Sequence, residues 1–154
     1  MPSKRSRKRG SAEGASDVQS VVIDANVLVS FFIERDEAQR VASKALLLKA
    51  VNGEITAIVP QFVVFEISYV FQTMYGATGQ RLATLIRDVV TLPGARVTDD
   101  CPWKRVLEVW PDPLPSLADA AILALATTNR YDSVATFDKK LAKQLKAAGI
   151  RTYW

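Results

Sequence analysis

Four acidic residues stand in apolar surroundings, where an ionised side chain requires an explanation. Asp24 closes Val-Val-Ile, Glu66 lies within Phe-Val-Val-Phe-Glu-Ile, Asp119 lies within Leu-Ala-Asp-Ala-Ala-Ile, and Asp138 follows Ala-Thr-Phe. The chain has no histidine and one cysteine, which excludes a histidine general base, His- or Cys-rich metal sites and an internal disulfide. Carboxylate ligands suit Mg²⁺ or Mn²⁺. Two such ions about 3.5–4 Å apart can drive phosphodiester hydrolysis without a side-chain nucleophile.

Each of these acids also has a structural interpretation when it is considered alone. Asp24 and Asp138 are favoured residues for a helix N-cap. Asp119 stands three residues after Ser116, which is the spacing of a capping box. Glu66 shares its expected helix face with aromatic and β-branched residues, and burying its charge is costly without a partner. A buried salt bridge to an arginine or lysine is therefore the alternative for Glu66.

Short β-branched runs alternate with helical patterns along the chain. We predict strands over 21–24, 56–59, 95–98, 133–136 and 150–153, and helices over 36–51, 61–75, 78–91, 103–110, 116–129 and 139–148. This alternation predicts βαβ units and a parallel sheet in an α/β domain. Ligands bind such sheets at the carboxyl ends of the strands. Two of the acids fall there and two fall early in helices, so all four can meet in one cleft.

The net charge of +4 is concentrated at the start of the 154-residue chain. Residues 1–19 carry a net +3 and the remainder only +1, so bulk charge does not argue for a nucleic-acid partner. We predict a flexible basic tail over 1–19 and one folded domain over 20–154. The tail fits nucleic-acid contact, solubilisation or an expression tag equally. Apolar runs are short or interrupted by acids, which predicts no membrane span or secretion signal and a soluble, cytoplasmic protein.

The four acidic segments occur at spacings of 42, 53 and 19 residues. They read Val-Val-Ile-Asp24-Ala-Asn26-Val-Leu-Val, Phe65-Glu66-Ile, Leu117-Ala-Asp119-Ala-Ala-Ile and Ala135-Thr136-Phe-Asp138-Lys-Lys-Leu. With these segments, residues 20–154 resemble the PIN-domain family and in particular its VapC-type toxin branch. The resemblance implies a three-layer α/β/α domain whose parallel sheet has the strand order 3-2-1-4-5.

The same resemblance implies an endoribonuclease that depends on one or two Mg²⁺ or Mn²⁺ ions. Its catalytic, metal-binding acids would be Asp24, Glu66, Asp119 and Asp138. Asn26 and Thr136 match polar positions that support these acids, and we expect Ser116 to act with them through its position before Asp119. The toxin branch further implies an RNA substrate, a homodimer and a cognate antitoxin that covers the site.

Cations near the acids are the candidates for RNA contact: Arg130 after the Asp119 helix, and Lys139 and Lys140 after Asp138. An ordinary solvated helix start is the alternative for the lysines. Competing functions are a non-toxin PIN nuclease of RNA processing and a non-catalytic binding module. A haloacid-dehalogenase-type phosphatase needs a second acid where Asn26 stands, and no Gly-rich dinucleotide or Walker loop is present.

Overall fold

The computed structural model describes residues 18–154. Within this range the strands are β1 (Gln19–Ile23), β2 (Ile55–Pro60), β3 (Ala95–Thr98) and β4 (Ser133–Ala135). The helices are α1 (Ala25–Phe32), α2 (Glu37–Val51), α3 (Gln61–Tyr75), α4 (Gly79–Val90), α5 (Trp103–Val109), α6 (Leu117–Thr128) and α7 (Lys139–Ala147). The helices predicted from the sequence all form, with ends shifted by one residue or less.

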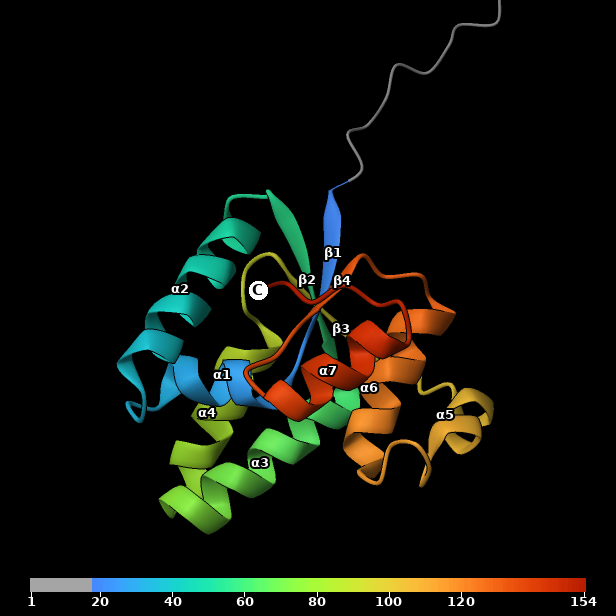
Figure 1. The fold of residues 1–154 in the computed structure, drawn as a ribbon. Helices are drawn as coiled ribbons and strands as arrows, with labels where there is room; N and C mark the ends of the chain where they lie inside the picture. The colour runs from blue at the N-terminus through green and yellow to red at the C-terminus, as the bar shows by residue number, and fades with distance from the viewer. Residues whose placement is uncertain (1–17) are drawn as a thin grey trace, which may run out of the picture.

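The four strands form one parallel sheet in the order β3-β2-β1-β4. Val22 of β1 lies opposite Ile58 of β2 on one side and Val134 of β4 on the other. Helices flank the sheet on both sides, with α2 on one side and α5 and α6 on the other (Figure 1). The predicted α/β class, the parallel sheet and the order of its first four strands are confirmed.

The fifth strand predicted over 150–153 does not form as a strand. The segment instead makes an isolated parallel bridge, with Thr152 opposite Val134. Two backbone hydrogen bonds hold it there, from Val134 N to the Arg151 carbonyl (3.0 Å) and from Tyr153 N to the Val134 carbonyl (2.9 Å). The segment lies beside β4, as the expected order requires. Only this one pair of residues is bridged, so the segment does not form the run of consecutive pairs that a strand requires.

The sequence patterns did not predict α1, which begins directly after β1. Residues 21–32 form an apolar run whose period does not separate a strand from a buried helix. The break between the two elements is Asp24, whose side chain accepts a hydrogen bond from Ala25 N at the start of α1. As the N-cap of α1, Asp24 therefore marks the boundary between β1 and α1 within the apolar run, and the chain changes direction there, at the carboxyl end of β1.

The core lies on both faces of the central strands. Val21, Val22 and Ile23 of β1 are fully buried, as is Ile58 of β2. Helix α6 is buried on all sides, because every residue from 120 to 126 is inaccessible or nearly so. Its many alanines let neighbouring elements approach closely. A helix held this rigidly fixes the position of Asp119 in its first turn.

The predicted basic tail falls almost entirely outside the described residues. Only its last two residues are described, and Gln19 already pairs with Ile55 in the sheet. None of the helices between residues 18 and 154 combines the length and the apolar character that a membrane crossing requires.

Candidate active site

Asp24 lies at the carboxyl end of β1 with only 7% of its surface exposed. Its Oδ1 accepts a hydrogen bond from Ala25 N (2.8 Å), so the predicted N-cap is real. Its Oδ2 accepts from the Thr136 hydroxyl (2.7 Å) and from the Asn26 amide (3.0 Å). Both oxygens are therefore oriented by neighbours, and Oδ1, which accepts only one hydrogen bond, retains a lone pair for a further partner.

Thr136 and Asn26 connect Asp24 to the segment that carries Asp138. The Thr136 hydroxyl accepts a hydrogen bond from Asp138 N (3.0 Å), and Asn26 Oδ1 accepts one from Phe137 N (3.1 Å). Thr136 is 8% exposed and follows β4, the parallel neighbour of β1. The two adjacent strands thus present their acidic ends together, held by a small polar network.

Asp138 is exposed at the start of α7. Its Oδ1 accepts hydrogen bonds from Lys140 N (2.8 Å) and Leu141 N (3.2 Å), which makes it the N-cap that the sequence suggested. The following Lys139 and Lys140 are also exposed. Lys140 is close enough to Asp119 to lower the pKa of that carboxyl, against larger opposing effects.

Glu66 lies in the second turn of α3, half-buried rather than sunk in the core. Burial raises its pKa to about 7, and the charges of Asp24 and Asp119 add to this effect. The salt bridges among residues 18–154 involve Arg40 with Glu34 and Glu37, and Arg105 with Glu108. Within that range Glu66 therefore lacks the buried ion pair that was its structural alternative.

Asp119 lies in the first turn of α6, where Ser116 caps the helix. Ser116 Oγ accepts a hydrogen bond from Asp119 N (3.3 Å), as the predicted cap requires. Burial raises the pKa of the Asp119 carboxyl to about 6, followed by repulsion from Asp24 and then Asp138. The Asp119 carboxyl therefore lies within electrostatic range of Asp24 and Asp138, while its backbone N–H satisfies the cap.

The structure thus brings the four sequence-predicted acids within electrostatic range of one another. Burial raises the pKa of Asp24, and Asp138 contributes to that rise. Every one of the four either feels the charge of another or exerts its own charge on one. Like charges gathered so that three of them, Asp24, Glu66 and Asp119, have raised pKa values cost stability, and such clusters are typical of functional sites.

These residues fit a divalent cation by the chemistry of their donors. All four are hard carboxylate oxygens, and the network of Asn26 and Thr136 orients one of them as outer groups do at metal sites. As the side chains stand, no three acidic or cysteine groups among residues 18–154 converge closely enough to hold an ion. A cation held by several of these carboxylates would need them closer together than they stand, and its charge would offset their repulsion.

The structure does not bring Arg130 to these acids. Arg130 lies beyond the end of α6 opposite Asp119, and about 14 Å of helix already separates Asp119 from Thr128 at about 1.5 Å per residue. It has a left-handed backbone, with φ of 54°, in the turn before β4. Lys140, in contrast, is close enough to lower the pKa of Asp119.

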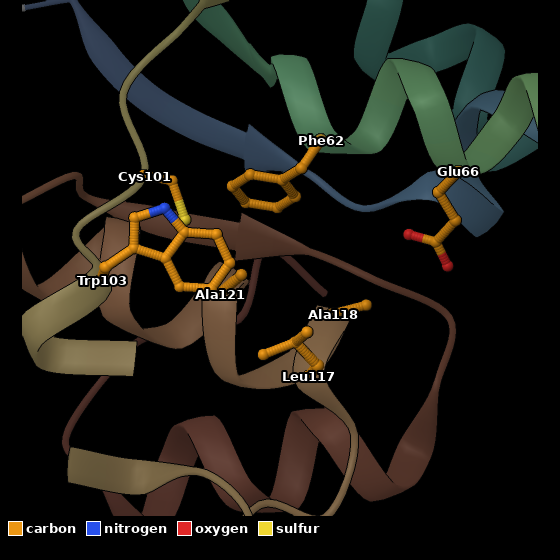
Figure 2. Close-up of a pocket in the computed structure, with 7 residues that line it drawn as sticks. All are labelled: Phe62, Glu66, Cys101, Trp103, Leu117, Ala118 and Ala121. Atoms are coloured by element: carbon orange, nitrogen blue, oxygen red, sulfur yellow. The ribbon is translucent and has the colours of Figure 1, made fainter. Parts of the chain in front are cut away.

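Sequence patterns missed an apolar pocket beside Glu66. Phe62, Cys101, Trp103, Leu117 and two alanines of α6 line it together with Glu66, around a volume of about 430 Å³ (Figure 2). These residues come from α3, α5, α6 and the loop before α5, so no local period joins them. The available signal was Trp103, a large aromatic residue at the start of a short helix.

Solved structures with the same fold include two bacterial proteins. VapC20 of Mycobacterium tuberculosis, described as a toxin that cleaves the sarcin–ricin loop, superposes with a TM-score of 0.65 at 16% identity, over 84% of this chain and 95% of its own. FitAcB of Neisseria gonorrhoeae superposes with a TM-score of 0.58 at 16% identity, over 87% of this chain and 96% of its own. No curated protein matches the sequence closely enough to count as a relative.

The parallel sheet with acids gathered at its carboxyl edge defines the class of this protein as an α/β domain built around an acidic site. The family model of the PIN domain matches residues 21–146, which include all four acids. The chain belongs to the PIN domain family, which confirms the resemblance read from its acidic segments. Membership supports a nuclease activity.

Proposed function

We propose that this protein is a Mg²⁺- or Mn²⁺-dependent endoribonuclease whose catalytic acids are Asp24, Glu66, Asp119 and Asp138. The observation that carries the proposal is the burial of Asp24, Glu66 and Asp119 within electrostatic range of other acids of the set, Asp138 included, without a salt bridge to any of the four among residues 18–154. Such a set is costly in the empty protein, and a divalent cation removes that cost. Membership in the PIN domain family supports the same activity.

The four carboxylates are the residues that would hold the metal. When bound, Mg²⁺ or Mn²⁺ supplies activation of water and stabilisation of the leaving oxygen in phosphodiester hydrolysis. Asp24 is held in position by Thr136 and Asn26, which fix its rotamer before any ligand arrives. Lys140, close to Asp119, offers its ammonium group to the substrate phosphate, and Lys139 beside it extends this basic surface.

The experiment is cleavage of a labelled single-stranded RNA by the purified protein with EDTA, Mg²⁺ or Mn²⁺. We expect cleavage only with the metals, and a loss of at least about 100-fold in Asp24→Asn and in Asp119→Asn. Glu34→Gln, which alters an exposed acid outside the site, is the control and should cleave as the wild type does. Full metal-dependent cleavage by Asp24→Asn would contradict the assignment, and no metal dependence at all would favour a non-catalytic binding module.

A phosphatase of the haloacid-dehalogenase type is disfavoured by the role of Asn26. Its amide donates to Asp24 Oδ2 (3.0 Å), and its carbonyl oxygen accepts from Phe137 N (3.1 Å). Both ends of the side chain are therefore committed to supporting the loop. The position where that chemistry needs a second acid is occupied by a scaffold amide.

We further propose that the protein is the toxin of a toxin–antitoxin pair and acts in the cytoplasm, where RNA is available. The fold likeness to VapC20, itself described as a toxin, supports this reading over a PIN nuclease of RNA processing. Induced expression in a bacterial host tests it. We expect growth arrest that Asp119→Asn abolishes and that co-expression of a small partner encoded beside the gene relieves.

A homodimer is also proposed, with α3 as part of its interface. Phe65, Tyr69 and Met74 of that helix are each 68% exposed, which is unusual for large apolar side chains without a partner. Light scattering on the purified protein should give twice the mass of one chain. Tyr69→Glu should then give the monomer mass, and a wild-type monomer would contradict the dimer.

A further inference from the structure

The apolar pocket beside Glu66 is a second feature of this site, and the hydrolytic chemistry makes no use of it. The Phe62 ring and the Trp103 indole form two of its walls, and Leu117 with alanines of α6 closes another side (Figure 2). Trp103 is 55% exposed, although it is the largest side chain in the pocket. An aromatic face left open to solvent is available for a ligand.

The size and lining of the pocket fit one flat aromatic group. Its volume of about 430 Å³ lies within the range of about 300–1,000 Å³ typical of small-ligand sites. Bases of single-stranded RNA are read by stacking on Phe, Tyr or Trp, and every base offers a π-face. Phe62 and Trp103 supply such faces from α3 and α5.

The position of the pocket connects it to the acidic site. Glu66 is one of the lining residues, and Phe62 stands one helical turn before it on α3. A nucleotide whose base occupied this pocket would therefore carry its phosphates toward the carboxylates. Lys104 and Arg105 follow Trp103 directly and line a neighbouring hollow together with it, where their charges suit the phosphate backbone of an RNA strand that continues past the pocket.

We propose that this pocket receives an unpaired base of the RNA next to the cleaved bond, with Trp103 as the principal stacking residue. The inference rests on the proposed function, since it assumes an RNA substrate at the acids. Trp103 is a positioning residue under this proposal, because it fixes where the strand lies without touching the reacting phosphate. The enzyme would accordingly require single-stranded or flipped-out nucleotides at the cleavage position.

The kinetic test uses Trp103→Leu, which keeps an apolar side chain and removes the π-face, and Trp103→Tyr, which retains stacking. With a single-stranded RNA and Mn²⁺, Trp103→Leu should raise KM about 5- to 150-fold with little change in kcat. Trp103→Tyr should recover most of that loss. Leu107→Ala, on the same helix with 60% exposure and outside the pocket, is the matched control and should leave KM unchanged.

RNAs with one abasic nucleotide near the cleaved bond make this test specific for the base. One such substitution should raise KM for the wild type and have no further effect in Trp103→Leu, because both remove the same contact. Equal KM values for the wild type and Trp103→Leu would overturn the proposal. That result would instead favour an apolar segment of a partner protein as the occupant of the pocket.

Cys101 allows a test that does not depend on cleavage. It is the only cysteine of the sequence and it lines the pocket, so its alkylation by N-ethylmaleimide reports on occupancy. Millimolar AMP or UMP should slow alkylation in the wild type and not in Trp103→Leu, whereas ribose 5-phosphate should protect neither protein. Absence of protection by any nucleotide would refute the base pocket even if RNA is cleaved. Protection without cleavage would keep the pocket and refute the proposed nuclease.

Discussion

The Thr136 hydroxyl forms hydrogen bonds with three groups of the proposed site. It donates to Asp24 Oδ2, accepts from Asp138 N, and lies 3.3 Å from the Asn26 amide. Thr136 is 8% exposed, so water cannot replace these bonds in the folded protein. One hydroxyl thus orients one acid and anchors the backbone of another.

Replacing this hydroxyl by a methyl group tests the network. Thr136→Val preserves shape but leaves polar groups of Asp24 and Asp138 unpaired, which should cost about 1–3 kcal/mol of unfolding free energy. Metal-dependent cleavage should fall about 10- to 100-fold, as for other outer groups of metal sites. Thr136→Ser restores the hydroxyl and should recover most of the lost stability and most of the lost cleavage. Wild-type stability and cleavage in Thr136→Val would show that the network is dispensable.

The pH dependence of the unfolding free energy should reveal how much stability is lost when Glu66 ionises in the acidic cluster. The pKa of Glu66 rises from 4.5 to about 7 on folding, so between those values the folded state holds the proton more firmly than the unfolded state. Its contribution to stability is therefore lost as pH rises toward 7. In EDTA, the unfolding free energy of Glu66→Gln should equal that of the wild type at pH 4. At pH 8 the variant should be more stable than the wild type by about 1 kcal/mol, after allowance for solvent screening.

Denaturant unfolding at the two pH values measures this difference. Glu54→Gln, at an exposed carboxylate just before β2, is the control for loss of one negative charge. A loss of more than about 2 kcal/mol in Glu66→Gln would instead indicate that Glu66 makes a structural ion pair.

The fold elements that position the site were largely predictable because their patterns are local. A β-branched run followed by Asp24, and Asn52-Gly53 or Gly76 after apolar periods, each fix an element end within a few residues. Helix α1 was not predicted, because no Gly or Pro within the apolar run 21–32 marks where the strand ends and the helix begins. The fifth strand did not form because residues 150–153 pair with β4 at Thr152 alone, and the local pattern of these residues does not show how many pairs a distant neighbour will make.

The residues of the proposed site also fall into those that local sequence could predict and those that it could not. The four acids of the proposed site could be selected from the sequence because each carboxylate contradicts its apolar neighbours, and the structure places each within electrostatic range of another. Trp103 could not be selected in this way, because its role depends on Phe62 and α6 residues far away in sequence. Arg130 follows the Asp119 helix in sequence, but the length of that helix places it at the end opposite Asp119, which sequence adjacency alone does not show.

The junction between α2 and β3 shows how a single glycine holds two elements together. Gly94 has φ of +74°, and a Cβ there would collide with the backbone carbonyl of Ala50 near the end of α2. Its own carbonyl accepts a hydrogen bond from Ala57 N in β2 (3.2 Å). The close approach seats α2 against the sheet.

Two glycine substitutions separate backbone strain from this collision. Gly94→Ala should lower the unfolding free energy by about 2–5 kcal/mol, since it combines a left-handed conformation with overpacking against backbone. Gly53→Ala has the same φ of +74° but open space, so strain alone should cost it about 1–2 kcal/mol. Denaturant melts of both variants measure the difference, and equal losses would contradict the packing account.

The protein as a whole should respond to metal and proton together. The raised pKa values of Glu66, about 7, and Asp119, about 6, mean that protons compete with a cation for these oxygens. Mn²⁺ should raise the Tm by several degrees at pH 8 and much less at pH 5. The Asp24→Asn variant should lose this stabilisation at both values. An equal Mn²⁺ effect at pH 5 and pH 8 would place the ion elsewhere.

The most direct test is a crystal structure of the protein soaked in Mn²⁺, with anomalous diffraction used to locate the ion. We predict at least one Mn²⁺ peak bound by carboxylate oxygens from Asp24 and at least one of Glu66, Asp119 and Asp138, at coordination distances of roughly 2.0–2.2 Å. Ordered Mn²⁺ only at surface acids such as Glu34 or Asp99, with the four carboxylates still apart, would contradict the account.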